Sequence, residues 1–72
     1  MANREETASG HEARSARTRA QLIEAAIDVI AAVGYEEATT RALSQAAKTT
    51  LSAIPYHFGS KKKLYLAAAN RI

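Results

Sequence analysis

Residues 39–58 constrain the fold of this chain more tightly than any other segment. Residues 39–47 predict one short helix and residues 51–58 predict a second, since both combine helix-forming residues with apolar side chains at helical spacing. Only residues 48–50 lie between them, which leaves room for no more than a tight turn. Two helices joined in this way form a helix-turn-helix, and small alanines let such steeply crossing helices approach closely.

The charges of the chain are divided unevenly along its length. All seven acidic residues lie at or before residue 37, whereas residues 38–72 contain six basic residues and no acid. The first 37 residues have four arginines against the seven acids, a net −3 (4 − 7), and the rest has +6. Because the purely cationic half also holds the helix-turn-helix pattern, the sequence predicts binding to double-stranded DNA.

Composition excludes several other classes of protein. The 72 residues suffice for one small domain, and the absence of cysteine excludes disulfides and thiolate metal sites. His11 and His57 are too few and too far apart for zinc, so we expect no metal and no cofactor. No apolar run has the length of a membrane span, and the N-terminus does not resemble a secretory signal. We therefore expect a cytoplasmic protein without a membrane partner.

The same composition indicates an all-α fold, because alanine, leucine and isoleucine outnumber strand-forming residues and glycine and proline are sparse. We expect a three-helix core containing the helix-turn-helix, followed by the start of a fourth helix. The chain lacks a glycine-rich loop, an acid after residue 37 and any plausible set of nucleophile, base and orienting group. We therefore expect no enzymatic activity.

The first predicted helix is clearest over residues 18–33, where apolar residues recur every three or four positions up to Val33. Thr18 or Ser15 could cap its start, and the sequence does not decide between them. Residues 1–14 have no apolar period, so we expect a flexible N-terminal arm before a helix-turn-helix domain over residues 15–72. Arginines 14, 17 and 19 could enter a minor groove, although for at least two of them solvated charge is the better interpretation.

The remaining helices have recognisable ends. Thr39 or Thr40 caps the second helix, Gly59 stops the third, and Ser60 caps the fourth. The third begins near residues 50–51. The expected core residues of these helices are Leu43, Ala46, Ala47, Ile54, Phe58, Leu64, Ala67, Ala68 and Ile72. Because the sequence ends inside the last apolar pattern, we expect a longer parent protein with a further C-terminal domain.

Four cations lie where a helix N-terminus disfavours them. Lys61, Lys62 and Lys63 fill the first turn of the fourth helix, and Arg41 lies in the first turn of the second. Such a pattern indicates that an anion is expected there, so we predict phosphate contact, first for Lys61. Arg41 could instead reach a guanine edge. The alternative for all four is a solvated surface charge.

The two ends of the third helix supply the other candidates. Recognition helices present their first turn to base edges, which nominates residues 50–53: Thr50, Leu51, Ser52 and Ala53. Thr50 could be only an N-cap, and Leu51 could equally be core. At the other end, Tyr56 and His57 could each bind a phosphate. Tyr56 could otherwise pack as an aromatic, and His57 could merely cap the helix.

These segments together resemble the N-terminal DNA-binding domain of TetR-family transcriptional regulators, over roughly residues 18–72. The matching elements are Gly34, Thr39-Thr40-Arg41, Ile54-Pro55-Tyr56-His57-Phe58, Gly59-Ser60-Lys61 and Leu64-Tyr65. The resemblance implies that the following residues touch DNA: Thr40, Arg41, Thr50, Ser52, Ala53, Tyr56, His57 and Lys61. Four positions depart from the family pattern: Lys48 where glycine is usual, Thr49, Pro55 and Lys62.

The resemblance also implies partners. Family members bind paired half-sites as homodimers, through a C-terminal domain that also takes a small-molecule ligand, and are usually released from DNA by that ligand. We expect this shorter chain to be a monomer. The alternative function is a small basic helical module that binds RNA or an acidic protein.

Overall fold

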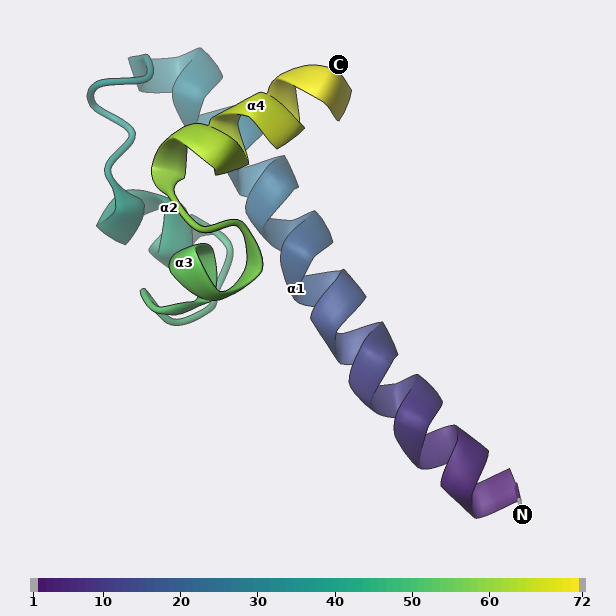
Figure 1. The fold of residues 1–72 in the computed structure, drawn as a ribbon. Helices are drawn as coiled ribbons and strands as arrows, with labels where there is room; N and C mark the ends of the chain where they lie inside the picture. The colour runs from purple at the N-terminus through teal and green to yellow at the C-terminus, as the bar shows by residue number, and fades with distance from the viewer. Residues whose placement is uncertain (1, 72) are drawn as a thin grey trace.

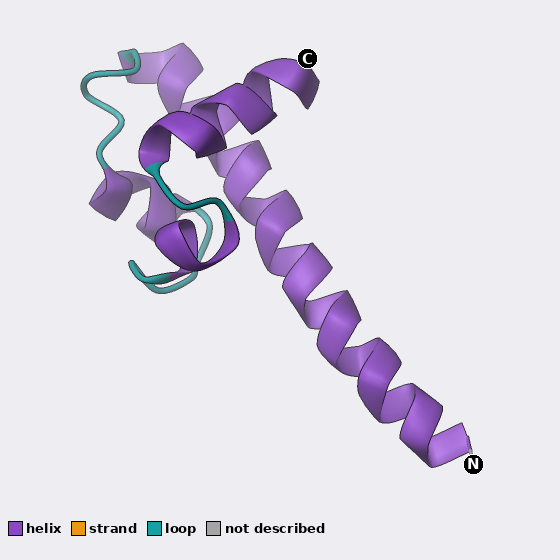
Figure 2. Ribbon diagram, in the orientation of Figure 1, coloured by secondary structure: helices purple, strands orange, loops and turns teal. Residues whose placement is uncertain are grey.

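The computed structural model describes the backbone of residues 2–71 and the side chains of residues 13–71. It contains four helices: α1 (Ala2–Val33), α2 (Thr40–Ala46), α3 (Ala53–His57) and α4 (Lys61–Arg71). Loops and turns connect them, and no strand occurs within the described backbone (Figure 2). The predicted all-α class and the helix-turn-helix formed by α2 and α3 are therefore confirmed.

Helix α1 is much longer than predicted. Its C-terminal half packs against the other helices, whereas its N-terminal half projects away from them (Figure 1). The predicted start at Ser15 or Thr18 is wrong, because α1 already begins at Ala2. Residues 2–17 are rich in alanine, arginine and glutamate, whose helix propensity favours continuation of the helix through this segment. The flexibility expected of residues 1–14 stays a prediction, and Met1 lies outside the described residues.

Each helix contributes one large side chain to the centre of the core. Leu22 of α1, Leu43 of α2, Ile54 of α3 and Leu64 of α4 are all at most 1% exposed. Small residues surround them: Ala25, Ala26, Ala38, Ala47, Ala53 and Ala68. Alanines at these contacts let four short elements pack closely, so a 72-residue chain forms a continuous core.

Two residues predicted to pack are exposed. Val33 is 51% exposed at the end of α1, and Ala46 is exposed on α2. The buried face of α2 instead includes Ser44, whose hydroxyl donates a 2.9 Å hydrogen bond to the Arg41 carbonyl. That bond satisfies the hydroxyl inside the core, so a polar residue there carries little penalty. Ile72 lies outside the described residues.

The predicted helix caps at Thr39 and Ser60 are confirmed. Thr39 Oγ1 accepts a 3.1 Å hydrogen bond from the Ala42 amide, and Ser60 Oγ accepts a 3.2 Å bond from the Lys63 amide. Each bond pairs one backbone donor that the first turn of a helix leaves free. The caps fix where α2 and α4 begin, and those two helix starts lie in the candidate site.

The turn after α2 has a left-handed backbone conformation at Lys48, although its sequence has no glycine there. Lys48 has φ +59°, the left-handed conformation that glycine usually supplies. The Lys48 amide donates to the Gln45 carbonyl at 3.1 Å, and the Thr49 amide donates to the Ser44 carbonyl at 2.9 Å. These two bonds form a Schellman motif. The positive φ of Lys48 shows that the turn is not rebuilt around the lysine.

Helix α3 begins at Ala53, later than predicted. Residues 50–52 form a turn in which the Ala53 amide donates to the Thr50 carbonyl at 3.1 Å. The Thr50 hydroxyl lies 3.2 Å from the Ser52 hydroxyl, so Thr50 does not serve as a side-chain cap. Pro55 is the third residue of α3, where a backbone donor has no partner within the helix in any case. The missing donor of Pro55 therefore removes no hydrogen bond from within α3.

Candidate nucleic-acid interface

The starts of α2 and α4 and the turn before α3 meet around one open hollow of about 520 Å³. Its lining includes four of the predicted DNA-binding residues: Thr40, Leu51, Ser52 and Lys61. Thr40 is the first residue of α2 and Lys61 is the first residue of α4. Two helix N-termini, each with a partial positive charge, thus border the same surface as the hydroxyl of Ser52. We call this surface the α2–α4 hollow.

The structure distinguishes among the residues at the start of α3. Leu51 is 50% exposed, which places it on the surface and not in the core. Ser52 is also exposed, whereas Ala53 is only 8% exposed and belongs to the core cluster. Ala53 therefore offers little area to a partner, and its packing accounts for the small residue at that position.

A second hollow lies between α1 and the end of α3. It is lined by Arg14, Ser15, Thr18, Tyr56 and His57. Tyr56 is 79% exposed, and its ring meets the His57 ring edge-on with centroids 4.8 Å apart. The two predicted phosphate contacts therefore face α1, in a surface that we call the α1–α3 hollow. The packing alternative for Tyr56 is disfavoured because so little of the side chain is covered.

The arginines at positions 14, 17 and 19 of α1 have different surroundings. Arg14 faces α3 in the α1–α3 hollow, and the Arg19 guanidinium lies 5.3 Å from the centre of the Phe58 ring. Arg17 lines another hollow, together with Glu24 and Asp28 of α1 and with Lys48. The sequence did not distinguish Arg14 from its neighbours, because nothing in residues 12–19 shows which side of α1 α3 covers.

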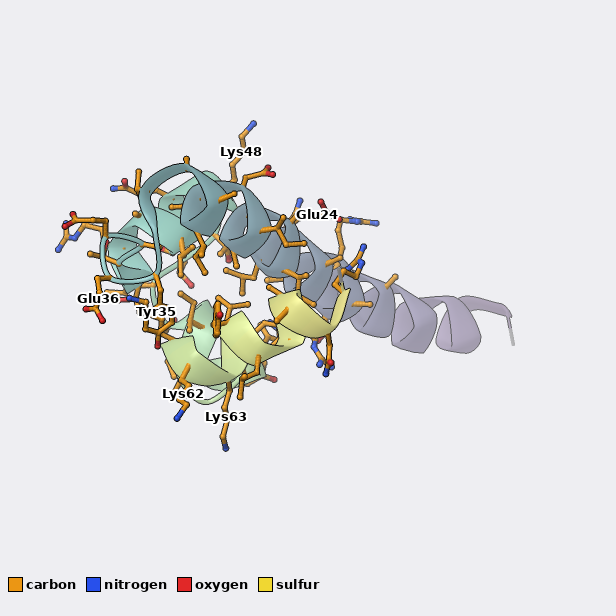
Figure 3. All side chains as sticks on the ribbon, turned by 90° about the horizontal axis from the view of Figure 1, so that it is seen from above. Glu24, Tyr35, Glu36, Lys48, Lys62 and Lys63 are labelled. Atoms are coloured by element: carbon orange, nitrogen blue, oxygen red, sulfur yellow. The ribbon has the colours of Figure 1, made fainter. Side chains whose placement is uncertain are left out.

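The lysines of the cationic half do not form one patch. Lys61 is half-buried, with its ammonium 4.2 Å from the centre of the Tyr35 ring. Lys62 and Lys63 are exposed and point away from the body of the molecule, while Lys48 points out on the opposite side (Figure 3). Arg41 is exposed on α2, directly after Thr40. Lys61 is thus the lysine that the fold places in the α2–α4 hollow.

The positive charge of this surface is not neutralised within the described side chains. Among residues 13–71, one ion pair forms, between Arg71 of α4 and Glu24 of α1 at 3.1 Å. It is solvent-exposed and joins two helices away from the α2–α4 hollow. Arg41 and Lys61 therefore keep their charge available to an anion. No helix within the described backbone is both long and apolar enough to cross a membrane.

Comparison with known proteins identifies the family of this chain. Residues 22–68 match the family described as bacterial regulatory proteins, tetR family, and this segment runs from the buried Leu22 to Ala68 of α4. The chain belongs to this family. It is accordingly a helix-turn-helix DNA-binding domain of a transcriptional regulator, a family that is regulatory and not enzymatic.

Two curated relatives carry the same description, HTH-type transcriptional repressor AcnR. The protein from Corynebacterium efficiens is 44% identical over 52 residues, and the protein from Corynebacterium glutamicum is 42% identical over 52 residues. Each alignment covers 72% of this chain, which spans only 28% of the relative. No solved structure matches the chain significantly.

Proposed function

We propose that the α2–α4 hollow and the α1–α3 hollow form one DNA-binding edge, and that this domain reads a specific duplex sequence. The observation that supports it most directly is the convergence of Thr40, Ser52 and Lys61 from three separate elements around the α2–α4 hollow. These residues lie at most 21 positions apart (61 − 40), but they belong to three different elements, so the packing of α2, α3 and α4 brings them to one surface.

Within this edge, the residues have two kinds of role. Ser52 and Arg41 read base edges, with Leu51 available to contact a thymine methyl group. Phosphates are held by Lys61 with Thr40 in the α2–α4 hollow and by Tyr56 and His57 in the other. Thr50 and Lys62 line neither hollow, and each precedes or follows a residue of the α2–α4 hollow in the sequence. To these sequence-predicted residues we add Arg14, because it lines the hollow beside Tyr56 and His57.

For a parent protein of the relatives' length, we propose a cytoplasmic repressor that binds its operator as a homodimer. The relatives named as transcriptional repressors support this role. A small-molecule ligand bound outside the present 72 residues would release the repressor from DNA. A single domain lacks the effective concentration that a linked second reader provides, so this chain alone would be a monomer and bind weakly. Sedimentation at micromolar concentration would expose a stable dimer and so contradict that part.

The deciding experiment is fluorescence anisotropy with duplex DNA, single-stranded RNA and heparin across a salt series. We expect duplex DNA to bind with a log–log salt slope of about −0.9 for each phosphate neutralised. A duplex affinity that did not change between low and moderate salt would contradict the proposed phosphate contacts. Preference for RNA or heparin over every duplex would instead favour a general polyanion-binding module.

A further inference from the structure

Tyr35 lies in the turn between α1 and α2, yet its side chain reaches the start of α4. Its ring centre is 4.2 Å from the Lys61 ammonium nitrogen. It also meets the Tyr65 ring of α4 edge-on, with centroids 5.0 Å apart and an angle of 68° between the planes. Tyr35 is half-buried, so the ring is held by its surroundings and offers one surface to the lysine.

The contact separates Lys61 from the lysines that follow it. Lys62 and Lys63 point into solvent (Figure 3). The ammonium of Lys61, in contrast, lies over the Tyr35 ring. Glu36 is the residue after Tyr35, but no described carboxylate lies within 4.0 Å of the Lys61 ammonium. A lysine ammonium has three hydrogen-bond donors, and one that lies over a ring still has a donor for another acceptor.

We propose that Tyr35 is a positioning residue for DNA binding, which holds the Lys61 ammonium at the mouth of the α2–α4 hollow for a phosphate oxygen. The inference rests on the proposed function, since it takes Lys61 as a phosphate contact. A lysine on a flexible four-carbon stem loses side-chain entropy when a phosphate fixes it. Tyr35 removes part of that loss before DNA arrives, and the edge contact with Tyr65 keeps the ring in place.

The test is a double-mutant cycle on duplex affinity with the 72-residue chain. We expect Tyr35→Leu to weaken binding by about two- to fivefold, the equivalent of an exposed cation–π contact of about 0.5–1 kcal/mol. In the Lys61→Ala background, Tyr35→Leu should have no further effect. Combined with Lys62→Ala, the matched control on the same helix turn, the two losses should multiply.

Two further measurements separate positioning from folding. Tyr35→Phe keeps the ring face and should restore wild-type affinity. In the unmutated chain, ring currents should shift the ε-methylene protons of Lys61 upfield of those of Lys62, with and without DNA. An equal loss from Tyr35→Leu in the wild-type and Lys61→Ala backgrounds would overturn the proposal, as would tighter binding by Tyr35→Leu.

These measurements also separate failure of the positioning role of Tyr35 from failure of the proposed DNA binding. If wild-type duplex binding is salt-dependent and Lys61→Ala weakens it while Tyr35 and Lys61 show no coupling, only the positioning role fails. If duplex DNA does not bind at all, the proposed function fails, and the positioning role fails with it. The chemical shifts of the Lys61 ε-methylene protons then show only whether the ring contact exists.

Discussion

The two turns that flank α3 share a backbone conformation but use different residues to reach it. The turn before α3 contains Lys48 at φ +59°, and the turn after it contains Gly59 at φ +94°. A φ of +59° lies at the centre of the left-handed region, about +57°, where a side chain is strained but accommodated. A φ of +94° lies beyond that centre by about 37°, where only glycine is comfortable.

The lysines in or after the two turns, Lys48 and Lys61, also lie in different parts of the molecule. Lys48 lies beside Arg17, Glu24 and Asp28 on one side of α1. The turn at Gly59 leads directly to Lys61 in the α2–α4 hollow. A lysine thus occupies the turn position whose φ stays close to the left-handed minimum, on a side of the molecule away from the proposed phosphate contact.

The largest effect should come from Gly59→Ala. We expect the free energy of unfolding to fall by about 1–3 kcal/mol, since alanine is strained at this φ. The added Cβ would lie 3.5 Å from Lys63 Cδ, an ordinary contact, so the loss should come from the backbone. Urea melts should show it. Gly34→Ala is the control, with φ +90° and no neighbour within 4 Å, and should lose a similar amount. A neutral Gly59→Ala would contradict the contrast with Lys48.

Next in size is the difference between Lys61→Ala and Lys48→Ala in duplex binding. Lys61→Ala should weaken all duplexes alike by about 1 kcal/mol and reduce the magnitude of the salt slope by about 1. Lys48→Ala should leave both the affinity and the slope nearly unchanged. Anisotropy titrations at several salt concentrations measure both quantities. Equal effects from the two lysines would mean that net charge alone, and not the α2–α4 hollow, governs binding.

A smaller difference should separate Arg14 from Arg17, three residues apart on α1. Arg14 lines the α1–α3 hollow with Tyr56 and His57, whereas Arg17 lies on the Lys48 side beside two acids. Arg14→Ala should weaken duplex binding by about 0.5–1 kcal/mol, the range of an exposed charge pair, and Arg17→Ala should weaken it less. The same titrations apply. A larger loss of duplex affinity from Arg17→Ala would indicate that the interface lies on the other side of α1.

The smallest effect should be a gain in stability from Lys48→Gly. Relief of left-handed strain, about 1 kcal/mol, is offset by the loss of a favourable cation near the C-terminus of α2 and by the greater entropy of the unfolded chain. We expect the free energy of unfolding to rise by roughly 0.5 kcal/mol or less. Lys48→Ala provides the matched control, because it keeps the Cβ and should show no gain. A loss of stability in Lys48→Gly would mean that the charge outweighs the strain.

Much of the fold follows from local signals in the sequence. The core leucines and Ile54, the caps at Thr39 and Ser60, and the positive φ of Lys48 could all be predicted, because each depends on spacing or on nearby backbone groups. The start of α3 could not, since residues 50–52 form a turn whose hydrogen bonds resemble the first turn of a helix. The start of α1 could not be predicted either, because residues 2–14 lack the apolar period that marks the packed part of the helix.

For the candidate site, the sequence supplied the residues but not their arrangement. Lys61, Lys62 and Lys63 have the same charge and follow one another, yet only Lys61 lines the α2–α4 hollow. Its contact with Tyr35 joins residues that are 26 positions apart (61 − 35), so no local sequence pattern predicts it. Arg14 was likewise indistinguishable from Arg17 until the position of α3 against α1 was known. Long-range packing thus selects among equivalent charges.

The shortness of α3 has a consequence for local opening of the domain. Only Ala53 and Ile54 of its five residues are buried, and its final hydrogen bonds run from Phe58 and Gly59 to carbonyls one turn back. The last turn of such an element can open locally while Ile54 stays in the core. In hydrogen–deuterium exchange, the amides of residues 56–59 would therefore exchange before those near Leu22. If α3 contacts DNA as proposed, a bound duplex would slow the exchange of these amides selectively.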